Sequence, residues 1–157
     1  ESGTDRQCHH DRGLYRRMGM VFHATSQGKG EILLSGRILV VDDEEKIRLI
    51  IRKYGEFEGY EIDEAANGME AVEKCQKQDY DLLIMDVMMP ELDGFFTCAA
   101  IKKTKDIPVI MLSARGEEYD RIHGFECGVD DYVVKPFSPK ELMMRAKVVM
   151  SRQKTTE

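Results

Sequence analysis

LLIMDVMMPELDG, at residues 82–94, is the stretch of this chain that decides its fold. Four apolar residues lead to a single carboxylate, Asp86, and a turn containing Pro and Gly follows it. The apolar run is too short for a helix and too uniformly apolar for a half-exposed strand. It therefore predicts a strand buried on both faces of a parallel sheet. Taken alone, Asp86 is equally consistent with a residue that caps the next turn.

Composition and charge restrict the class of protein. The chain has 157 residues, the length of one domain with a sizeable core. No apolar run approaches the roughly 18 residues that a membrane span needs, and the N-terminus lacks a secretory signal pattern. Four widely spaced cysteines are typical of reduced thiols rather than of disulfides or a zinc site. We therefore expect a cytoplasmic protein without a membrane partner, and the net charge of −6 argues against nonspecific binding of nucleic acid.

The first 36 residues show neither a helical nor a strand period. Cys8-His9-His10-Asp11 is a poor metal site, because two adjacent His side chains do not easily reach one ion and the spacing matches no common zinc pattern. We expect residues 1–36 to be a flexible leader, or one added for expression. The folded domain then spans residues 37–152, and residues 153–157 begin a linker or C-terminal tail.

Five short strand-like segments alternate with five helical patterns along the remainder of the chain. The predicted strands are residues 38–41, 61–65, 82–85, 109–112 and 132–134. The residues expected to face inward from the helices are Ile47, Ile50, Ile51 and Tyr54; Ala71, Val72 and Cys75; Phe95, Cys98, Ala99 and Ile101; Ile122 and Phe125 in a helix over 117–126; and Leu142, Ala146, Val149 and Met150. Ser138 and Pro139 are typical of the start of the last helix. Alternation of this kind predicts an α/β doubly wound parallel sheet.

Polar residues end four of these strands. They are Asp42 and Asp43, Asp86, Ser113 and Lys135. Because the carboxyl ends of parallel strands share one edge of the sheet, these side chains should converge there. Three carboxylates close together repel one another and call for a divalent metal, and oxygen-only ligands favour Mg2+. A carboxylate beside a metal, a lysine and a hydroxyl is suited to phosphoryl transfer.

Four motifs then identify a family. ILVVDD at 38–43, LIMDVMMPELDG at 83–94, MLSA at 111–114 and DDYVVKPF at 130–137 together resemble the receiver domain of bacterial two-component response regulators. The region that follows the third motif is most similar to receivers attached to winged-helix DNA-binding domains. The resemblance implies a flavodoxin-like sheet with strand order 2-1-3-4-5. It also implies that Asp86 accepts a phosphoryl group from the phosphohistidine of a sensor histidine kinase, and that the domain catalyses only its own phosphorylation and dephosphorylation.

The resemblance also implies a role for each site residue. Asp43, Asp86 and the main-chain carbonyl of Met88 would bind Mg2+ directly, and Asp42 would act through water. Lys135 would pair with the phosphoryl group and Ser113 would donate a hydrogen bond to it, while Tyr132 would be an aromatic switch. The Lys135–Pro136 peptide bond would be cis, which an X-Pro bond adopts at modest cost.

The implied partners are a sensor kinase, a second copy of the chain after phosphorylation, and DNA through an output domain outside this sequence. The dimer would use crossed ion pairs, namely Arg121 with Glu141, Asp131 with Arg145, and Glu126 with Lys147. The alternative for Glu141 and Arg145 is an ordinary pair within one helix, because their spacing is i, i+4.

Three other functions fit this sequence less well. A phosphatase of the haloacid dehalogenase class would need a second acid two residues after its nucleophile, where this chain has Met88. A flavin-binding module would need a small, polar phosphate loop after the first strand, where this chain has four acids at residues 42–45. An interaction domain that is never phosphorylated would not need the complete acceptor set. Departures from the family pattern are few: residues 95–96 and 98–100 make the third helix less polar than usual, and Gly55 should loosen the first helix by up to about 1 kcal/mol relative to Ala.

Overall fold

The computed structural model describes residues 20–24, 30–34, 36–89, 92–114 and 128–152. Its strands are β1 (Met20–Ala24), β2 (Gly30–Leu34), β3 (Arg37–Val41), β4 (Glu61–Ala65), β5 (Leu82–Asp86), β6 (Val109–Ala114) and β7 (Asp131–Lys135). Its helices are α2 (Glu45–Phe57), α3 (Gly68–Lys77), α4 (Gly94–Lys102) and α6 (Pro139–Arg152). Every predicted strand is present within one or two residues of its predicted ends. The predicted helix over 117–126 lies outside the described residues.

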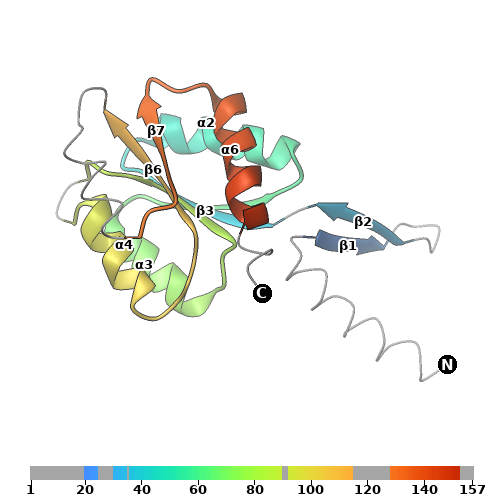
Figure 1. Cartoon of the computed structure of the whole chain (residues 1–157), viewed down its shortest axis with the longest axis horizontal. Coiled ribbons are helices and arrows are strands. Elements are labelled where there is room, and N and C mark those ends of the chain that lie inside the picture. The colour runs from blue at the N-terminus through green and yellow to red at the C-terminus, as the bar shows by residue number, and fades with distance from the viewer. Residues whose placement is uncertain (1–19, 25–29, 35, 90–91, 115–127, 153–157) are drawn as a thin grey trace.

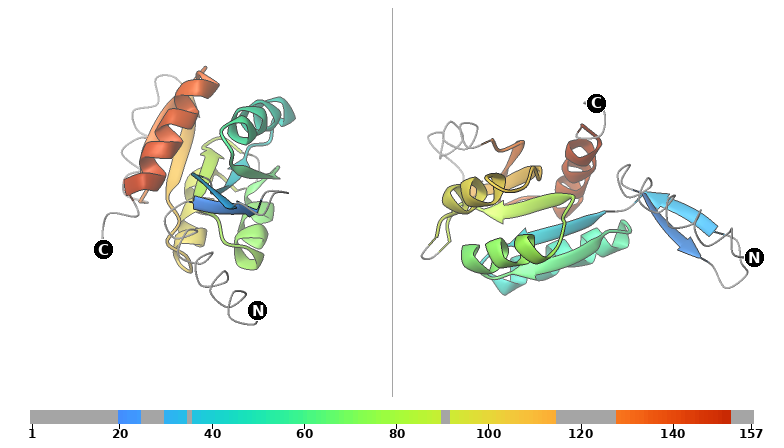
Figure 2. Two further views of the ribbon diagram at one scale, coloured as in Figure 1. Left: turned by 90° about the vertical axis from the view of Figure 1, so that its right-hand side faces the viewer. Right: turned by 90° about the horizontal axis from the view of Figure 1, so that it is seen from below.

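The last five strands form one parallel sheet in the order β4-β3-β5-β6-β7. Counted along the chain from β3, this is the order 2-1-3-4-5, so the predicted flavodoxin-like α/β fold is confirmed. Helices α2 and α6 cover one face of the sheet, and α3 and α4 cover the other (Figures 1 and 2). All the strands of this sheet therefore present their carboxyl ends at one common edge.

Alternation along each central strand divides the core into two layers. On β5, Leu83 and Met85 face α3 and α4, whereas Leu82 and Ile84 face α2 and α6. Both layers are closed to solvent, so all five residues of β5 are buried. A one-residue slip of the strand would exchange the two faces, and the filled layers on both sides oppose it. This packing fixes the position of Asp86, the last residue of β5, along the strand direction.

Side-chain caps begin three of the helices. Asn67 accepts a hydrogen bond from the Glu70 amide at the start of α3, and Asp93 accepts one from the Phe96 amide, at 2.8 Å, at the start of α4. Ser138 Oγ accepts a hydrogen bond from the Glu141 amide at 3.3 Å, which confirms the predicted N-cap of α6. These contacts satisfy amide groups that an uncapped helix start leaves without partners.

The buried stripe of α2 differs from the predicted one. Ile50 and Tyr54 are 40% and 42% exposed, while Ile51 and Gly55 are buried and Ile47 packs partly against the core. Gly55 lies where α2 packs closely against β4, since a Cβ atom at this position would come within 2.5 Å of Ile62 Cδ1. The small residue allows this approach. The prediction from helical spacing was therefore wrong for Ile50 and Tyr54, because packing against the sheet turns Ile51 and Gly55 inward instead.

Strands β1 and β2 form an antiparallel hairpin that pairs Met20 with Leu34 and Ala24 with Gly30. The sequence had predicted no regular structure before Arg37, so this hairpin differs from the expectation for residues 20–34. It precedes β3 and lies at the end of the sheet opposite the carboxyl ends of the strands (Figure 1). Among the described residues, no helix is both long and apolar enough to cross a bilayer.

Two glycines make a matched test of this packing. A Cβ atom at Gly94 would overlap the main-chain carbonyl oxygen of Asp86 and lie 3.0 Å from Val87 Cα, so backbone would have to move. At Gly55 the nearest atoms belong to the flexible Ile62 side chain. We expect Gly94→Ala to destabilise the domain by about 1–3 kcal/mol. Gly55→Ala should change stability by less than about 1 kcal/mol, because the gain in helix propensity offsets the crowding. Urea denaturation followed by circular dichroism measures both, and equal losses would contradict this distinction.

Candidate phosphoacceptor site

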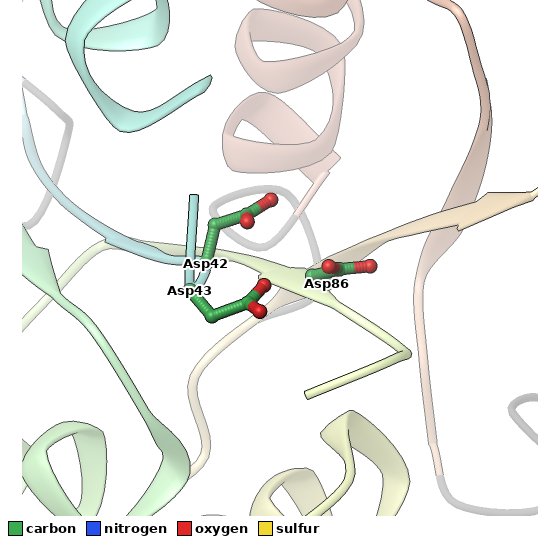
Figure 3. A group of neighbouring side chains, drawn as sticks. All are labelled: Asp42, Asp43 and Asp86. Atoms are coloured by element: carbon green, nitrogen blue, oxygen red, sulfur yellow. The ribbon is translucent and has the colours of Figure 1, made fainter. Parts of the chain in front are cut away.

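Three acidic side chains meet at the carboxyl edge of the sheet. Asp42 and Asp43 directly follow β3, and Asp86 ends the neighbouring strand β5. Each of the three offers a carboxylate oxygen that lies within 4.8 Å of those of the other two. Figure 3 shows the three residues together at this edge, with the Asp42 and Asp43 side chains extending toward the side on which Asp86 lies. The convergence predicted from the strand ends is therefore present.

Lys135 supplies the positive charge of the cluster. It ends β7, and its Nζ atom lies 3.2 Å from Asp86 Oδ2 and 3.4 Å from Asp42 Oδ2. Burial acts to lower the pKa of Lys135, but Asp86 and Asp42 outweigh burial and the pKa is raised. The ammonium group is therefore charged at neutral pH and is shared between two carboxylates.

Asp42 is the most enclosed member of the cluster, with no exposed surface. Its Oδ1 atom accepts a hydrogen bond from the Glu44 amide at 2.8 Å. Burial raises the pKa of Asp42 from its ordinary 3.8 to about 6, and the nearby Asp86 acts in the same direction. The Glu44 amide and Lys135 oppose this rise without cancelling it. At neutral pH the charged form of Asp42 is thus held at a cost in folding free energy.

Asp86 is also buried, with 5% of its surface exposed. Burial raises its pKa, although Lys135 acts in the opposite direction. Asp86 Oδ1 accepts a hydrogen bond from the Met88 amide at 3.3 Å, so the turn-capping interpretation of Asp86 is also correct. Its Oδ2 atom contacts Lys135. Asp86 therefore presents a carboxylate beside a cation, at the end of a rigid strand.

The donor set fits a hard divalent cation. The cluster offers carboxylate oxygens and no nitrogen or sulfur ligand, which favours Mg2+ over zinc or copper. Asp43 is exposed, so the cluster has a side that faces solvent, where a hydrated ion keeps its water ligands. The pKa values of Asp42 and Asp86 are both raised, because burial and neighbouring acids disfavour their charged forms. A bound cation would favour these charged forms.

The remaining predicted site residues lie on the strands next to this cluster. Ser113 is 2% exposed and directly follows Leu112, the β6 partner of Asp86. Tyr132 lies earlier on β7, paired with Met111, and is 8% exposed within the core layer that faces α3 and α4. Lys135–Pro136 is cis, as expected. The functional roles assigned to Ser113, Tyr132 and the Met88 carbonyl stay predictions.

The predicted dimer residues are only partly described. Arg121 and Glu126 lie outside the described residues, and Lys147 is exposed on α6. Arg145 already has two partners within its own chain, Asp131 on β7 at 3.1 Å and Glu141 at 3.3 Å. The pair within one helix is therefore present, and the crossed pairs between two chains stay a prediction.

Arg48 is a residue of the site that the sequence did not reveal. It lies in the first turns of α2, and its Nη1 atom donates a hydrogen bond to the main-chain carbonyl of Asp42 at 2.7 Å. Its Nε atom donates to Glu64 Oε1 on β4 at 3.2 Å. The sequence does place this basic residue in the helix that follows the acidic strand end. That pattern was not enough to predict its role, because charged residues are common on exposed helix faces.

Residues 38–147 match the family described as the response regulator receiver domain. This chain belongs to that family. It is 52% identical over 120 residues to the transcriptional regulatory protein ResD of Bacillus subtilis (strain 168), a match that covers 76% of this chain and 50% of ResD. It is 46% identical over 123 residues to the transcriptional regulatory protein SrrA of Staphylococcus aureus (strain NCTC 8325 / PS 47), with 78% of this chain and 51% of SrrA covered. The chain thus spans about half the length of these relatives.

Solved structures agree with the fold and the family. The Francisella response regulator 1452 receiver domain is 36% identical, with a TM-score of 0.70, and the match covers 74% of this chain and 98% of that one. A putative response regulator from Chloroflexus aurantiacus is 37% identical, with a TM-score of 0.71 and coverage of 75% and 99%. The chain is therefore a receiver phosphoacceptor domain with an acidic pocket formed by Asp42, Asp43 and Asp86, and it is not a conventional enzyme.

Burial of Asp42 predicts a pH-dependent effect of its removal. Because the folded-state pKa of about 6 lies above the ordinary 3.8, the wild-type domain loses stability as pH rises from about 4 to above 6. In a chelator at pH 7.5, Asp42→Asn should stabilise the domain by about 1–3 kcal/mol, and the gain should vanish near pH 4. Urea denaturation across this pH range measures it, with exposed Asp106→Asn as the control. A variant less stable than wild type at pH 7.5 would mean that the partners of Asp42 outweigh its burial.

Proposed function

We propose that this receiver domain takes a phosphoryl group from the phosphohistidine of a sensor histidine kinase onto Asp86, with Mg2+ bound at the acidic pocket. The single observation that carries this proposal is the arrangement of Asp86 at the end of β5, 3.2 Å from Lys135 and within carboxylate reach of Asp42 and Asp43. A nucleophile, a metal-binding set and a fixed cation are the three parts that phosphoryl transfer requires.

In the proposed step, a carboxylate oxygen of Asp86 attacks phosphorus and forms an acyl phosphate. The bond between phosphorus and the imidazole nitrogen breaks, and its electron pair stays with the nitrogen. Bound Mg2+ would supply charge neutralisation on the transferring group. Asp43, Asp86 and the Met88 carbonyl would hold the ion, with Asp42 acting through water.

The other strand-end residues would respond to the new charge. Lys135, which now divides its interaction between two carboxylates, would pair with the phosphoryl group. Ser113 would donate a hydrogen bond to it, and the nearby Tyr132 would change its rotamer. These movements would shift the population between two packings of a face that includes β7 and α6.

We propose that this face is the dimerisation surface and that the output is transcription. ResD and SrrA are named transcriptional regulatory proteins, and each is about twice as long as the part matched here, which supports a DNA-binding output domain outside this sequence. On this proposal the receiver contacts DNA only through that domain. The crossed ion pairs would be Arg121 with Glu141, Asp131 with Arg145, and Glu126 with Lys147, each made twice by a two-fold axis.

Removing the phosphoacceptor carboxylate should abolish labelling. Asp86→Asn keeps the shape of the side chain but provides no carboxylate nucleophile, so incubation with Mg2+ and acetyl phosphate should add no phosphoryl mass to it. Asp106→Asn, at an exposed position before β6, should be labelled like wild type. Intact-mass measurement with and without excess chelator reads out both the acceptor and the metal requirement. Labelling of Asp86→Asn at the wild-type level, or of wild type in chelator, would contradict the proposal.

Reversing one charge on α6 should weaken the phosphorylated dimer. Arg145→Glu places a third acid beside Asp131 and Glu141, so we expect the dissociation constant of the phosphorylated form to rise at least tenfold, a loss of about 1.4 kcal/mol. Lys140→Glu makes the same charge change at another exposed position of α6 and should have less effect. Sedimentation at low and high salt measures both variants. A phosphorylated Arg145→Glu variant that dimerises like wild type would exclude this face.

A further inference from the structure

Arg48 links helix α2 to the loop after β3 that carries Asp42 and Asp43. Its guanidinium donates one hydrogen bond to the Asp42 main-chain carbonyl at 2.7 Å and another to Glu64 at 3.2 Å. Only 15% of the Arg48 side chain and 25% of the Glu64 side chain are exposed. The planar fork of arginine suits this arrangement, because one rigid group bonds two acceptors, one in the loop after β3 and one on β4.

Glu64 is itself held in place from three directions. It lies on β4 in register with Val40 of β3, and its carboxylate also pairs with Arg52 at 3.1 Å. Lys74 of α3 donates a hydrogen bond to the Glu64 main-chain carbonyl. The anchor of Arg48 is therefore fixed by the sheet and by helices on both of its faces. Because Arg48 bonds both Glu64 and the Asp42 carbonyl, it holds the loop after β3 in a fixed position relative to β4.

The Asp42 carbonyl belongs to the same rigid plane as the Asp43 amide. The hydrogen bond from Arg48 to that oxygen therefore restricts rotation of the peptide plane. It also restricts the direction in which the Asp43 side chain projects from the backbone. The Asp42 side chain has anchors of its own, in the Glu44 amide and Lys135. Within the described ranges, no hydrogen bond or ion pair is found for the exposed Asp43 carboxylate. Its direction thus depends on the backbone that Arg48 holds.

We propose that Arg48 is a positioning residue for the divalent cation, acting through the main chain between Asp42 and Asp43. This inference rests on the proposed Mg2+ site. Arg48 does not contact the ion, and it holds in place the peptide unit from which the metal-binding Asp43 side chain projects.

A purely electrostatic role and a positioning role of Arg48 predict opposite changes in Mg2+ affinity when Arg48 is removed. If its positive charge alone mattered, removing it would reduce repulsion and tighten Mg2+ binding. If it positions Asp43, removing it weakens binding, because the ligand must then be ordered when the ion binds. Arg52 provides a matched control. It also pairs with Glu64 and donates to a main-chain carbonyl, that of Ile62 at 2.9 Å, but it makes no contact with the acidic loop.

The first experiment is calorimetric titration of Mg2+ into the wild-type chain, Arg48→Ala, Arg48→Lys and Arg52→Ala, with a thermal melt of each. Loss of an outer-shell partner typically weakens metal binding 10–100-fold. We expect the Mg2+ dissociation constant of Arg48→Ala to rise about tenfold. Arg52→Ala should stay within about twofold of wild type, although its melting temperature should also fall. Arg48→Lys keeps the charge but cannot bond both acceptors in the same geometry, so it should be intermediate.

The second experiment needs no metal. The Glu44 amide is bonded to Asp42 Oδ1, so its hydrogen exchange reports the order of the loop. We expect this amide to exchange faster in Arg48→Ala than in wild type or Arg52→Ala, measured by NMR in chelator.

The outcomes separate the two proposals. A wild-type chain that binds no Mg2+ overturns the proposed function, and the exchange data then still test whether Arg48 orders the loop. Wild-type binding with equal or tighter binding by Arg48→Ala overturns the positioning role. If Arg48→Ala does not fold, Arg48→Lys decides in its place, and Mg2+ affinity equal to that of wild type would overturn the inference.

Discussion

The mutual repulsion of three carboxylates is the constraint on which this structure depends. Parallel strands β3 and β5 deliver Asp42, Asp43 and Asp86 to one place, where each has an oxygen within 4.8 Å of the other two. At an effective dielectric near 20, each such pair costs a few kcal/mol. The fold tolerates this arrangement because Lys135, at the end of the edge strand β7, contacts both buried carboxylates. Fixing Lys135 therefore depends on β6 and β7 being packed in the correct order.

Lys135 contacts two carboxylates at once, those of Asp86 and Asp42. Its distances to Asp86 and Asp42 differ by little, 3.2 against 3.4 Å, so neither carboxylate holds it exclusively. Both acids have raised pKa values, which shows that one ammonium group does not compensate their burial fully. A new anionic group at Asp86 would compete for the same cation. On the proposed function, this competition would change which groups Lys135 holds and so shift the population between two arrangements of the site.

The sequence was sufficient for the sheet and the acidic pocket, because each strand is a short segment that ends at an identifiable polar residue. It failed where tertiary packing chooses between equivalent patterns. Ile50 and Tyr54 fit the helical period of α2 as well as Ile51 does, and the stripe that is buried includes Gly55, which carries no hydrophobic signal. Arg48 was missed because its acceptor is a main-chain carbonyl, and main-chain groups leave no trace in residue type. The pairing of Arg145 with Asp131 likewise requires the placement of α6 beside β7.

The contact between Lys135 and Asp42 joins residues 93 positions apart in the sequence. The three acids are translated before Lys135, because β7 is the last strand of this sheet along the chain. A nascent chain that ends before residue 135 carries all three carboxylates and lacks the lysine that the complete pocket uses. The acidic pocket is therefore electrostatically incomplete until nearly the whole domain has been translated.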